Sequence, residues 1–227
     1  MKKATKALLV VLCVVLLVAG SVMATLAYLT DTDKVVNTVT VGKVDITVDE
    51  SEVTPDGKPV EGADRVEGNE YHLIPGQTYV KDPTMTVKQG SEDSFVRMLV
   101  TINCLSELKA IFGDDFLPEN YVSGWDRAIW IPESVTEDSA ANTATYEFRY
   151  YKTVDASEAT EDIVLEPLFT GFTLPGVVTG EELETISDLE IIAVGNAIQT
   201  LGFEADAATG ATAEDAAWDA FDAQVNN

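Results

Sequence analysis

The sequence is poor in the residues from which most catalytic and metal sites are built. Its 227 residues include only two cysteines and one histidine. Cys13 lies in an apolar run near the N-terminus, so the rest of the chain holds one thiol, Cys104, and no internal disulfide. A histidine-based zinc site or a Ser-His-Asp triad would have to be built around the only histidine, His72, which lies beside a proline turn typical of a surface. The sequence therefore predicts no catalytic, cofactor-binding or metal-binding residues and no enzyme activity.

Basic residues are also scarce, with 14 lysines and arginines against 39 acids and a formal net charge of -25. Without residues 1–27, which contain three lysines and no acid, 11 basic residues remain against 39 acids, a net charge of -28. Such a surface repels phosphate backbones and anionic lipid heads, which excludes nucleic acid as a partner. Two acidic stretches, Asp31–Asp33 and Gly113–Asp115, do not continue as EF-hand loops and are interpreted as solvated acids.

The N-terminus combines three lysines with an uncharged run, residues 7–27. The run is long enough to span a bilayer, which needs about 20 apolar residues. Alternatively, Ala7–Ala19 forms the apolar region of a cleaved export signal, followed by Val22/Ala24 or Thr25/Ala27 as the pair of small residues at the cleavage site. Both interpretations leave the lysines in the cytoplasm and predict that the acidic body is exported. The protein is membrane-anchored only if the segment is retained.

The body alternates apolar and polar residues with period two from Val35 onward, which is typical of β-strands. Residues 28–34 are interpreted as a polar lead and residues 35–41 as the first strand. Three more strands are expected within residues 71–103, two within 124–154 and one within 188–203, while residues 50–70 are expected to form an exposed loop. Prolines in residues 163–176 predict that any strand there is bent or lies at an edge.

Helix signals are few. Residues 106–112 predict a short helix with Ser106 as its N-cap and Gly113 as its C-cap. The stronger prediction is a helix over 213–225, because Thr212 and Asp215 have capping-box spacing and four apolar residues share one face. These four are Ala217, Trp218, Phe221 and Val225. Many short strands and few helices predict a mainly β fold, a β-sandwich of the jelly-roll or immunoglobulin-like kind.

Four motifs in order resemble one family. They are "TLAYLTDTDKVVNTVTVGKVDI", "HLIPGQTYVKDPTMTVKQGSEDSFVRMLVTI", "EFRYYKTV…LEPLFTGFTLP" and "AIQTLGF…AEDAAWDAF". Together they cover nearly the whole chain and resemble TasA/camelysin (CalY)-like secreted proteins. The resemblance implies cleavage by a signal peptidase of the SipW type, with Thr25 and Ala27 before the scissile bond and Tyr28 as the first mature residue. It also implies a jelly-roll and a structural role at Gram-positive cell surfaces and in biofilm matrix.

The same resemblance implies a mode of assembly and a division of the chain. TasA-like subunits are thought to form fibres by donating an N-terminal strand to the next subunit, which satisfies an open sheet edge through main-chain hydrogen bonds. Residues 28–42 are then the candidate donor, with Val35, Val39 and Val41 as alternating plugs. The expected division is a signal peptide (1–27), this mature segment (28–42) and a β-sandwich domain (43–227).

Two other functions stay open on sequence alone. One is a non-polymerising binding module, either secreted or tethered to the membrane through the N-terminal segment. The other is a metalloprotease, a label that the family carries through camelysin, although the sequence has no HExxH or CxxC motif. The expected partners are the signal peptidase and further copies of the chain or related matrix proteins. The membrane is expected to be contacted only through the N-terminal segment.

Overall fold

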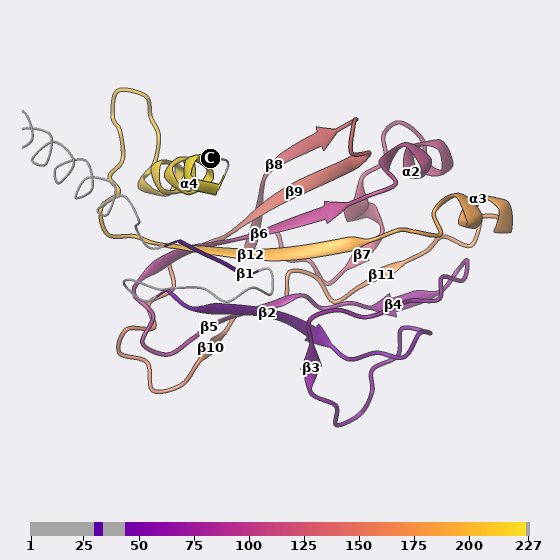
Figure 1. Ribbon diagram of the computed structural model, residues 1–227, viewed down its shortest axis with the longest axis horizontal. Helices are drawn as coiled ribbons and strands as arrows, with labels where there is room; N and C mark the ends of the chain where they lie inside the picture. The colour runs from indigo at the N-terminus through magenta and orange to yellow at the C-terminus, as the bar shows by residue number, and fades with distance from the viewer. Residues whose placement is uncertain (1–29, 34–43, 226–227) are drawn as a thin grey trace, which may run out of the picture.

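A computed structural model describes residues 30–33 and 44–225 (Figure 1). Over these residues the protein is mainly β, with three antiparallel sheets and few short helices, as the alternating pattern predicts. None of the helices within these two ranges is both long and apolar enough to cross a membrane.

The largest sheet has five antiparallel strands in the order β1-β12-β6-β9-β8. Their bounds are β1 Thr30–Asp33, β12 Ile191–Gln199, β6 Ser94–Ile102, β9 Thr143–Tyr150 and β8 Trp130–Asp138. The central strand β6 is paired with β12 along its whole length. Its buried residues Val96, Met98, Val100 and Ile102 share one face, which confirms the predicted alternation.

Two smaller sheets lie below the large one in Figure 1. The four-stranded sheet has the order β10-β5-β2-β3, with bounds Ile163–Val164, Thr84–Val87, Ile46–Ser51 and Arg65–Val66. The three-stranded sheet has the order β4-β11-β7, with bounds Thr78–Val80, Gly171–Thr173 and Val122–Ser123. The core lies between the large sheet and these two, where Met85 and Val87 of β5 belong to the same buried cluster as Met98 and Trp130.

Two expectations about this second layer need correction. The segment 50–70 is not only a loop, because β3 within it pairs with Glu50 and Ser51 of β2. The strand β11 is the middle strand of its sheet and not an edge, because Pro167 and Pro175 flank it and leave all its backbone N–H groups free to pair. The strand β10 does lie at an edge, as predicted.

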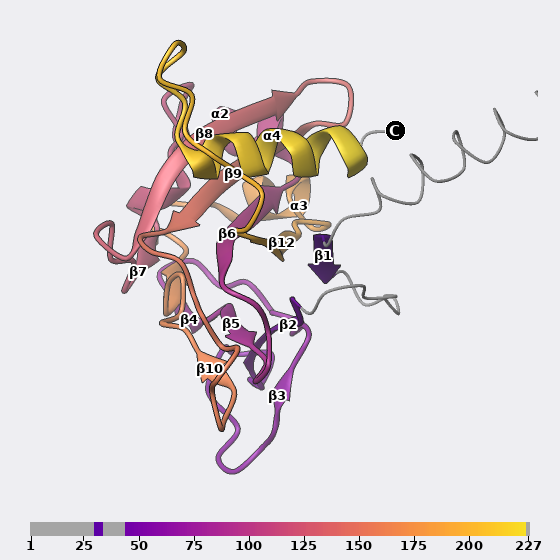
Figure 2. The ribbon, with the colours of Figure 1, turned by 90° about the vertical axis from the view of Figure 1, so that its left-hand side faces the viewer.

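The helix α4, Ala213–Val225, has the predicted bounds and packs over the outer face of the large sheet (Figure 2). The predicted cap is present: the Asp215 N–H donates to the Thr212 hydroxyl, and the Thr212 N–H donates to the Asp215 carboxylate. Ala217, Trp218 and Phe221 are buried as predicted, whereas Val225 is exposed because it lies in the final turn. The helix thus covers part of a sheet face that would otherwise be open to solvent.

The short helices differ more from expectation. The helix α2, Leu105–Phe112, begins one residue before the predicted cap, and Cys104 in the left-handed region takes the N-cap position. Ser106 lies inside the helix, where its N–H donates to the Asn142 side chain. Gly113 ends the helix as predicted. Sequence analysis did not predict the helix α3, Gly180–Thr185, or the 3-10 helix η1, Pro118–Asn120.

Candidate functional site: the β12 edge

In the described residues, the N-terminal strand β1 joins the large sheet along one edge of β12. Its inner side is paired with β6 over all nine residues, Ile191–Gln199. On its outer side the four residues of β1 run antiparallel, with Thr30 opposite Ile198 and Asp33 opposite Gly195. The strand β1 therefore covers only the second half of this outer edge.

The first half of the same edge, Ile191–Val194, has no strand partner among residues 30–33 and 44–225. Such an edge presents backbone N–H and C=O groups that can pair with an added strand. Ile192 is 43% exposed on it. Within the described residues, β1 therefore pairs with one half of this edge, Gly195–Ile198, and no strand pairs with the other half, which is called the open half below.

The half paired with β1 is packed tightly against the second layer at Gly195. A Cβ atom at this position would lie 2.5 Å from Val48 Cγ2 and 2.7 Å from Met85 Cε. Because neither distance is compatible with normal packing, only glycine lets β12 approach β2 and β5 this closely. The close approach fixes the position of β12 opposite Asp33 of β1.

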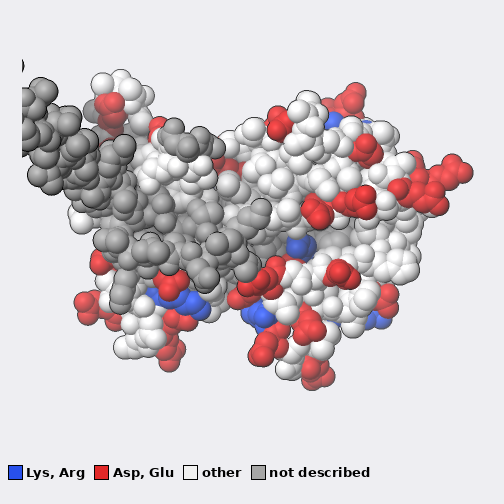
Figure 3. All heavy atoms as spheres, in the orientation of Figure 1, with Lys and Arg blue, Asp and Glu red and all other residues white. Residues whose placement is uncertain are grey.

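A recess of about 590 Å³ opens beside the open half. Its wall includes Ile191, Ile192 and Ala193 of β12 and Val48 and Asp49 of β2. Figure 3 shows this face, where acidic side chains surround a shaded hollow. An added strand on β12 would lie over this recess, which has both apolar and charged walls.

A buried ion pair forms the floor of the recess. Lys81 Nζ lies 2.7 Å from the Glu50 carboxylate, whose other oxygen accepts a hydrogen bond from the Asn69 amide. Desolvation by burial, followed by the nearby charges of Glu50 and Asp82, raises the pKa of the Tyr71 hydroxyl, which donates to the Val80 carbonyl. Because breaking such a pair leaves an uncompensated buried charge, these residues stabilise the recess.

The guanidinium of Arg65 joins β3 to its neighbours beside this pair. It contacts the carboxylates of Asp49 and Asp82 and donates to the Thr84 hydroxyl. Burial alone would raise the pKa of Asp82, but hydrogen bonds from Ser51 and Arg65 lower it below its usual range. The arrangement uses its charges to hold strands together and leaves no positioned nucleophile or base.

The sequence positions singled out for chemistry are not brought together. His72 is exposed on the loop before β4, and no group of three or more His, Cys, Asp or Glu side chains within the described ranges is arranged to hold a metal ion. Cys104 is half-buried, and desolvation, followed by Glu107, Asp188 and Glu190, raises the pKa of its thiol. A raised pKa lowers the thiolate fraction and therefore the reactivity of this cysteine.

Most residues proposed for export and assembly lie outside the described residues. These are Thr25, Ala27 and Tyr28 at the predicted cleavage site and the predicted plugs Val35, Val39 and Val41. The predicted polar lead is partly corrected, because Thr30–Asp33 within it forms β1. Sequence reasoning missed this strand because its residues are all polar, and pairing at an edge requires only backbone groups.

No family model, curated protein or solved structure matches this chain.

Proposed function

We propose that the protein is a secreted structural subunit of the cell surface or biofilm matrix, similar to the TasA/camelysin group. Its copies assemble when the N-terminal strand of one copy pairs with the β12 edge of the next. The proposal includes a jelly-roll arrangement of the sheets, cleavage between Ala27 and Tyr28 by a signal peptidase of the SipW type, and no enzymatic role. The observation that carries it is the pairing of β1 with one half of the outer edge of β12.

The pairing within one chain supplies a template for pairing between two. The strand β1 makes four residue pairs with β12, and a strand from a neighbour can make the same backbone hydrogen bonds. If the register continued in the assembled form, Val35 of the donor would lie opposite Ala193, and donor residues 34–37 would cover Ile191–Val194. The exchanged strand would then pair with Ile191–Ile198 of the neighbour, and each of these backbone pairs favours assembly.

Charge sets a condition on this assembly. Each cleaved copy, residues 28–227, carries a formal net charge of -28, so copies repel one another at low ionic strength. Salt screens such repulsion with a Debye length of about 8 Å at physiological ionic strength. Assembly is therefore expected to strengthen as the salt concentration rises.

The direct test compares chains 28–227 and 43–227 by electron microscopy and light scattering at matched concentration and salt. Chain 28–227 should form fibres, and chain 43–227 should remain monomeric because it lacks the donor. N-terminal sequencing of the protein exported by its host should find Tyr28 first. Fibres formed equally by chain 43–227 would overturn donor-strand assembly, and an intact N-terminus on the exported protein would support a membrane tether.

The alternative, a non-polymerising binding module, is favoured by one observation. The structure holds an apolar cavity beneath β6, β8 and β9, whose wall also includes Ile191 at the start of β12. If chain 28–227 stays monomeric but binds an apolar ligand, this alternative replaces the structural role.

A further inference from the structure

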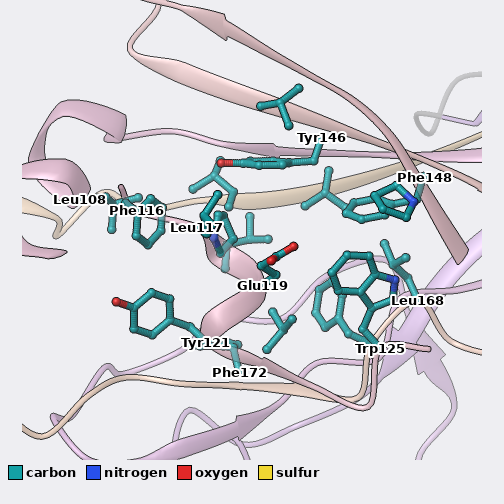
Figure 4. A pocket seen from close by; sticks show the side chains of 18 of the residues that line it. Leu108, Phe116, Leu117, Glu119, Tyr121, Trp125, Tyr146, Phe148, Leu168 and Phe172 are labelled. Carbon is teal, nitrogen blue, oxygen red and sulfur yellow. The ribbon is translucent and has the colours of Figure 1, made fainter. Parts of the chain in front are cut away.

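An apolar cavity of about 330 Å³ lies between the inner face of the large sheet and the three-stranded sheet. Figure 4 shows Tyr146 and Phe148 reaching into it from β9, with Tyr121, Trp125 and Phe172 on the opposite side. A cavity of about 150 Å³ holds one benzene molecule, and ligand pockets begin at about 300 Å³. The space is therefore large enough for a molecule with two aromatic rings.

Contacts among the wall residues hold the aromatic rings in place. Phe112, Phe116 and Tyr121 form one cluster, with ring centroids 4.8–5.6 Å apart. Trp125 packs edge-on against Phe148 at 5.2 Å, and its indole N–H donates to the Trp130 carbonyl at 2.9 Å. Because each ring has a neighbour that orients it, the cavity is preformed and loses little freedom when a ligand enters.

The carboxylates that line the cavity already have cationic partners. Glu119 lies 2.7 Å from Arg127, while Glu147 and Glu133 lie 2.9 and 3.6 Å from Arg149. A charged ligand would lose its hydration without gaining an unpaired group of opposite charge. The site consequently favours an uncharged ligand.

Two apolar side chains at the mouth are uncovered. Leu117 is 47% exposed and Val135 is 56% exposed, although both line the cavity. Val135 lies opposite Tyr146 in the β8–β9 register, so the two side chains share the inner face. A ligand seated against the rings would cover this apolar surface, which supplies a driving force for binding.

We propose that this cavity binds a small uncharged molecule with two aromatic rings. Ring faces and edges on both walls give such a molecule offset-stacked and edge-on contacts that an aliphatic chain of similar size does not make. The inference goes beyond assembly at β12. The two sites share Ile191, which lines the cavity and begins β12. Probe binding by a single copy tests the cavity, whereas fibre formation tests the β12 edge.

The test uses chain 28–227 and the neutral two-ring probe 1-naphthylamine, whose fluorescence changes in apolar surroundings. The expected result is saturable binding of one probe per chain, with a dissociation constant on the order of 10 µM. The sulfonated probe 8-aminonaphthalene-1-sulfonate has the same rings and a negative charge, and it should bind at least tenfold more weakly. Naphthalene and dodecanol are compared as competitors of the neutral probe. Displacing half of the bound probe should require at least tenfold more dodecanol than naphthalene.

The matched variants place one charge on each of two exposed strands. Val135→Asp at the mouth should weaken neutral-probe binding at least tenfold, whereas Val164→Asp on β10, which does not line the cavity, should leave it unchanged. Circular dichroism should show both variants folded, because both positions are more than half exposed. Absence of saturable binding, an unaffected Val135→Asp variant, or equal affinity for the charged probe would overturn the proposal. Displacement by dodecanol as effective as that by naphthalene would overturn the assignment to aromatic ligands.

Discussion

The two edges of the large sheet are built differently. At one edge, β8 runs for nine residues with Pro132, a register shift between Pro132 and Ser134, and exposed acids. Proline, irregular pairing and charge all hinder the addition of another strand. At the other edge, four residues of β1 cover half of β12 and leave Ile191–Val194 without a strand partner in the described part of the chain. The contrast indicates that the β8 edge is protected against strand addition, whereas the β12 edge accepts an added strand, β1.

The largest expected effect comes from placing the same charge on each edge. Ile192→Lys on β12 should reduce the assembled fraction of chain 28–227 at least tenfold, because a lysine on an edge opposes strand addition. Val135→Lys on β8 should leave assembly unchanged. The two positions are a matched pair, since their side chains are 43% and 56% exposed. Sedimentation of fibres measures both, and equal inhibition by the two variants would remove the distinction between the edges.

The second effect concerns how firmly each edge is packed. Gly195→Val should lower the free energy of unfolding by about 1–3 kcal/mol, because its side chain would overlap Val48 and Met85. Thr136→Val on the exposed strand β8 should change the same quantity by less than about 0.5 kcal/mol. Urea unfolding followed by circular dichroism compares them. A neutral Gly195→Val variant would show that β12 does not need its close approach to β2.

The third effect is a dependence of stability on pH at the helix that covers the sheet beside β12. The hydrogen bond from Arg149, followed by those from Thr212, lowers the pKa of Asp215 to about 2. Because the folded pKa lies below the usual value near 3.9, this carboxylate stabilises the fold above about pH 4, and that stability is lost as the pH falls toward 2.

The contribution of Asp215 should be about 1 kcal/mol, since its side chain is 39% exposed and solvent screens the pair. Unfolding of wild type and Asp215→Asn at pH 7 and pH 2.5 measures it. The difference in stability between the two proteins should be largest at pH 7 and shrink at pH 2.5. A difference that is constant across this range would contradict the assignment.

The smallest effect is expected at the tip of the protected edge. Glu137 of β8 pairs with Lys109 of α2 at 2.7 Å, but the glutamate side chain is 48% exposed. Exposed pairs contribute about 0–1 kcal/mol. Glu137→Gln should therefore change the thermal midpoint by no more than about 2 °C. A larger loss would mean that β8 is held more firmly than its exposure indicates.

The sequence predicted best those elements in which the spacing of apolar residues follows which side chains are buried. Alternation of Val96, Met98, Val100 and Ile102 places them on the inner face, and the Thr212–Asp215 cap fixes the start of α4. Arg97 lies on the other face of β6, where it is also buried. It lies 4.4 Å from the Trp218 ring and contacts Asp222, both contributed by a helix more than 100 residues later. A local pattern carries no information on such a partner.

The candidate sites were less predictable for the same reason. The polar strand β1 has no apolar period, and its pairing depends on an edge formed by residues more than 160 positions away. Trp130 and Trp218 are fully buried in the core, whereas Trp125 is half-buried and lines a cavity formed by several distant segments. Sequence could therefore identify the aromatic residues but not the space they enclose.

The central claim, that β1 of one copy pairs with β12 of another, can be tested with two single-cysteine chains. Asp31→Cys and Ala197→Cys occupy directly opposed positions in the antiparallel register, where Cα atoms lie about 4.5–5.5 Å apart and suit a disulfide. Both are made in chain 28–227 with Cys104→Ser, mixed under assembly conditions and oxidised. The account predicts disulfide-linked dimers that contain one chain of each kind and are absent from either chain alone. If a chain carrying both cysteines forms only an internal disulfide and the mixture gives no such dimer, the strand stays in its own copy and the account is wrong.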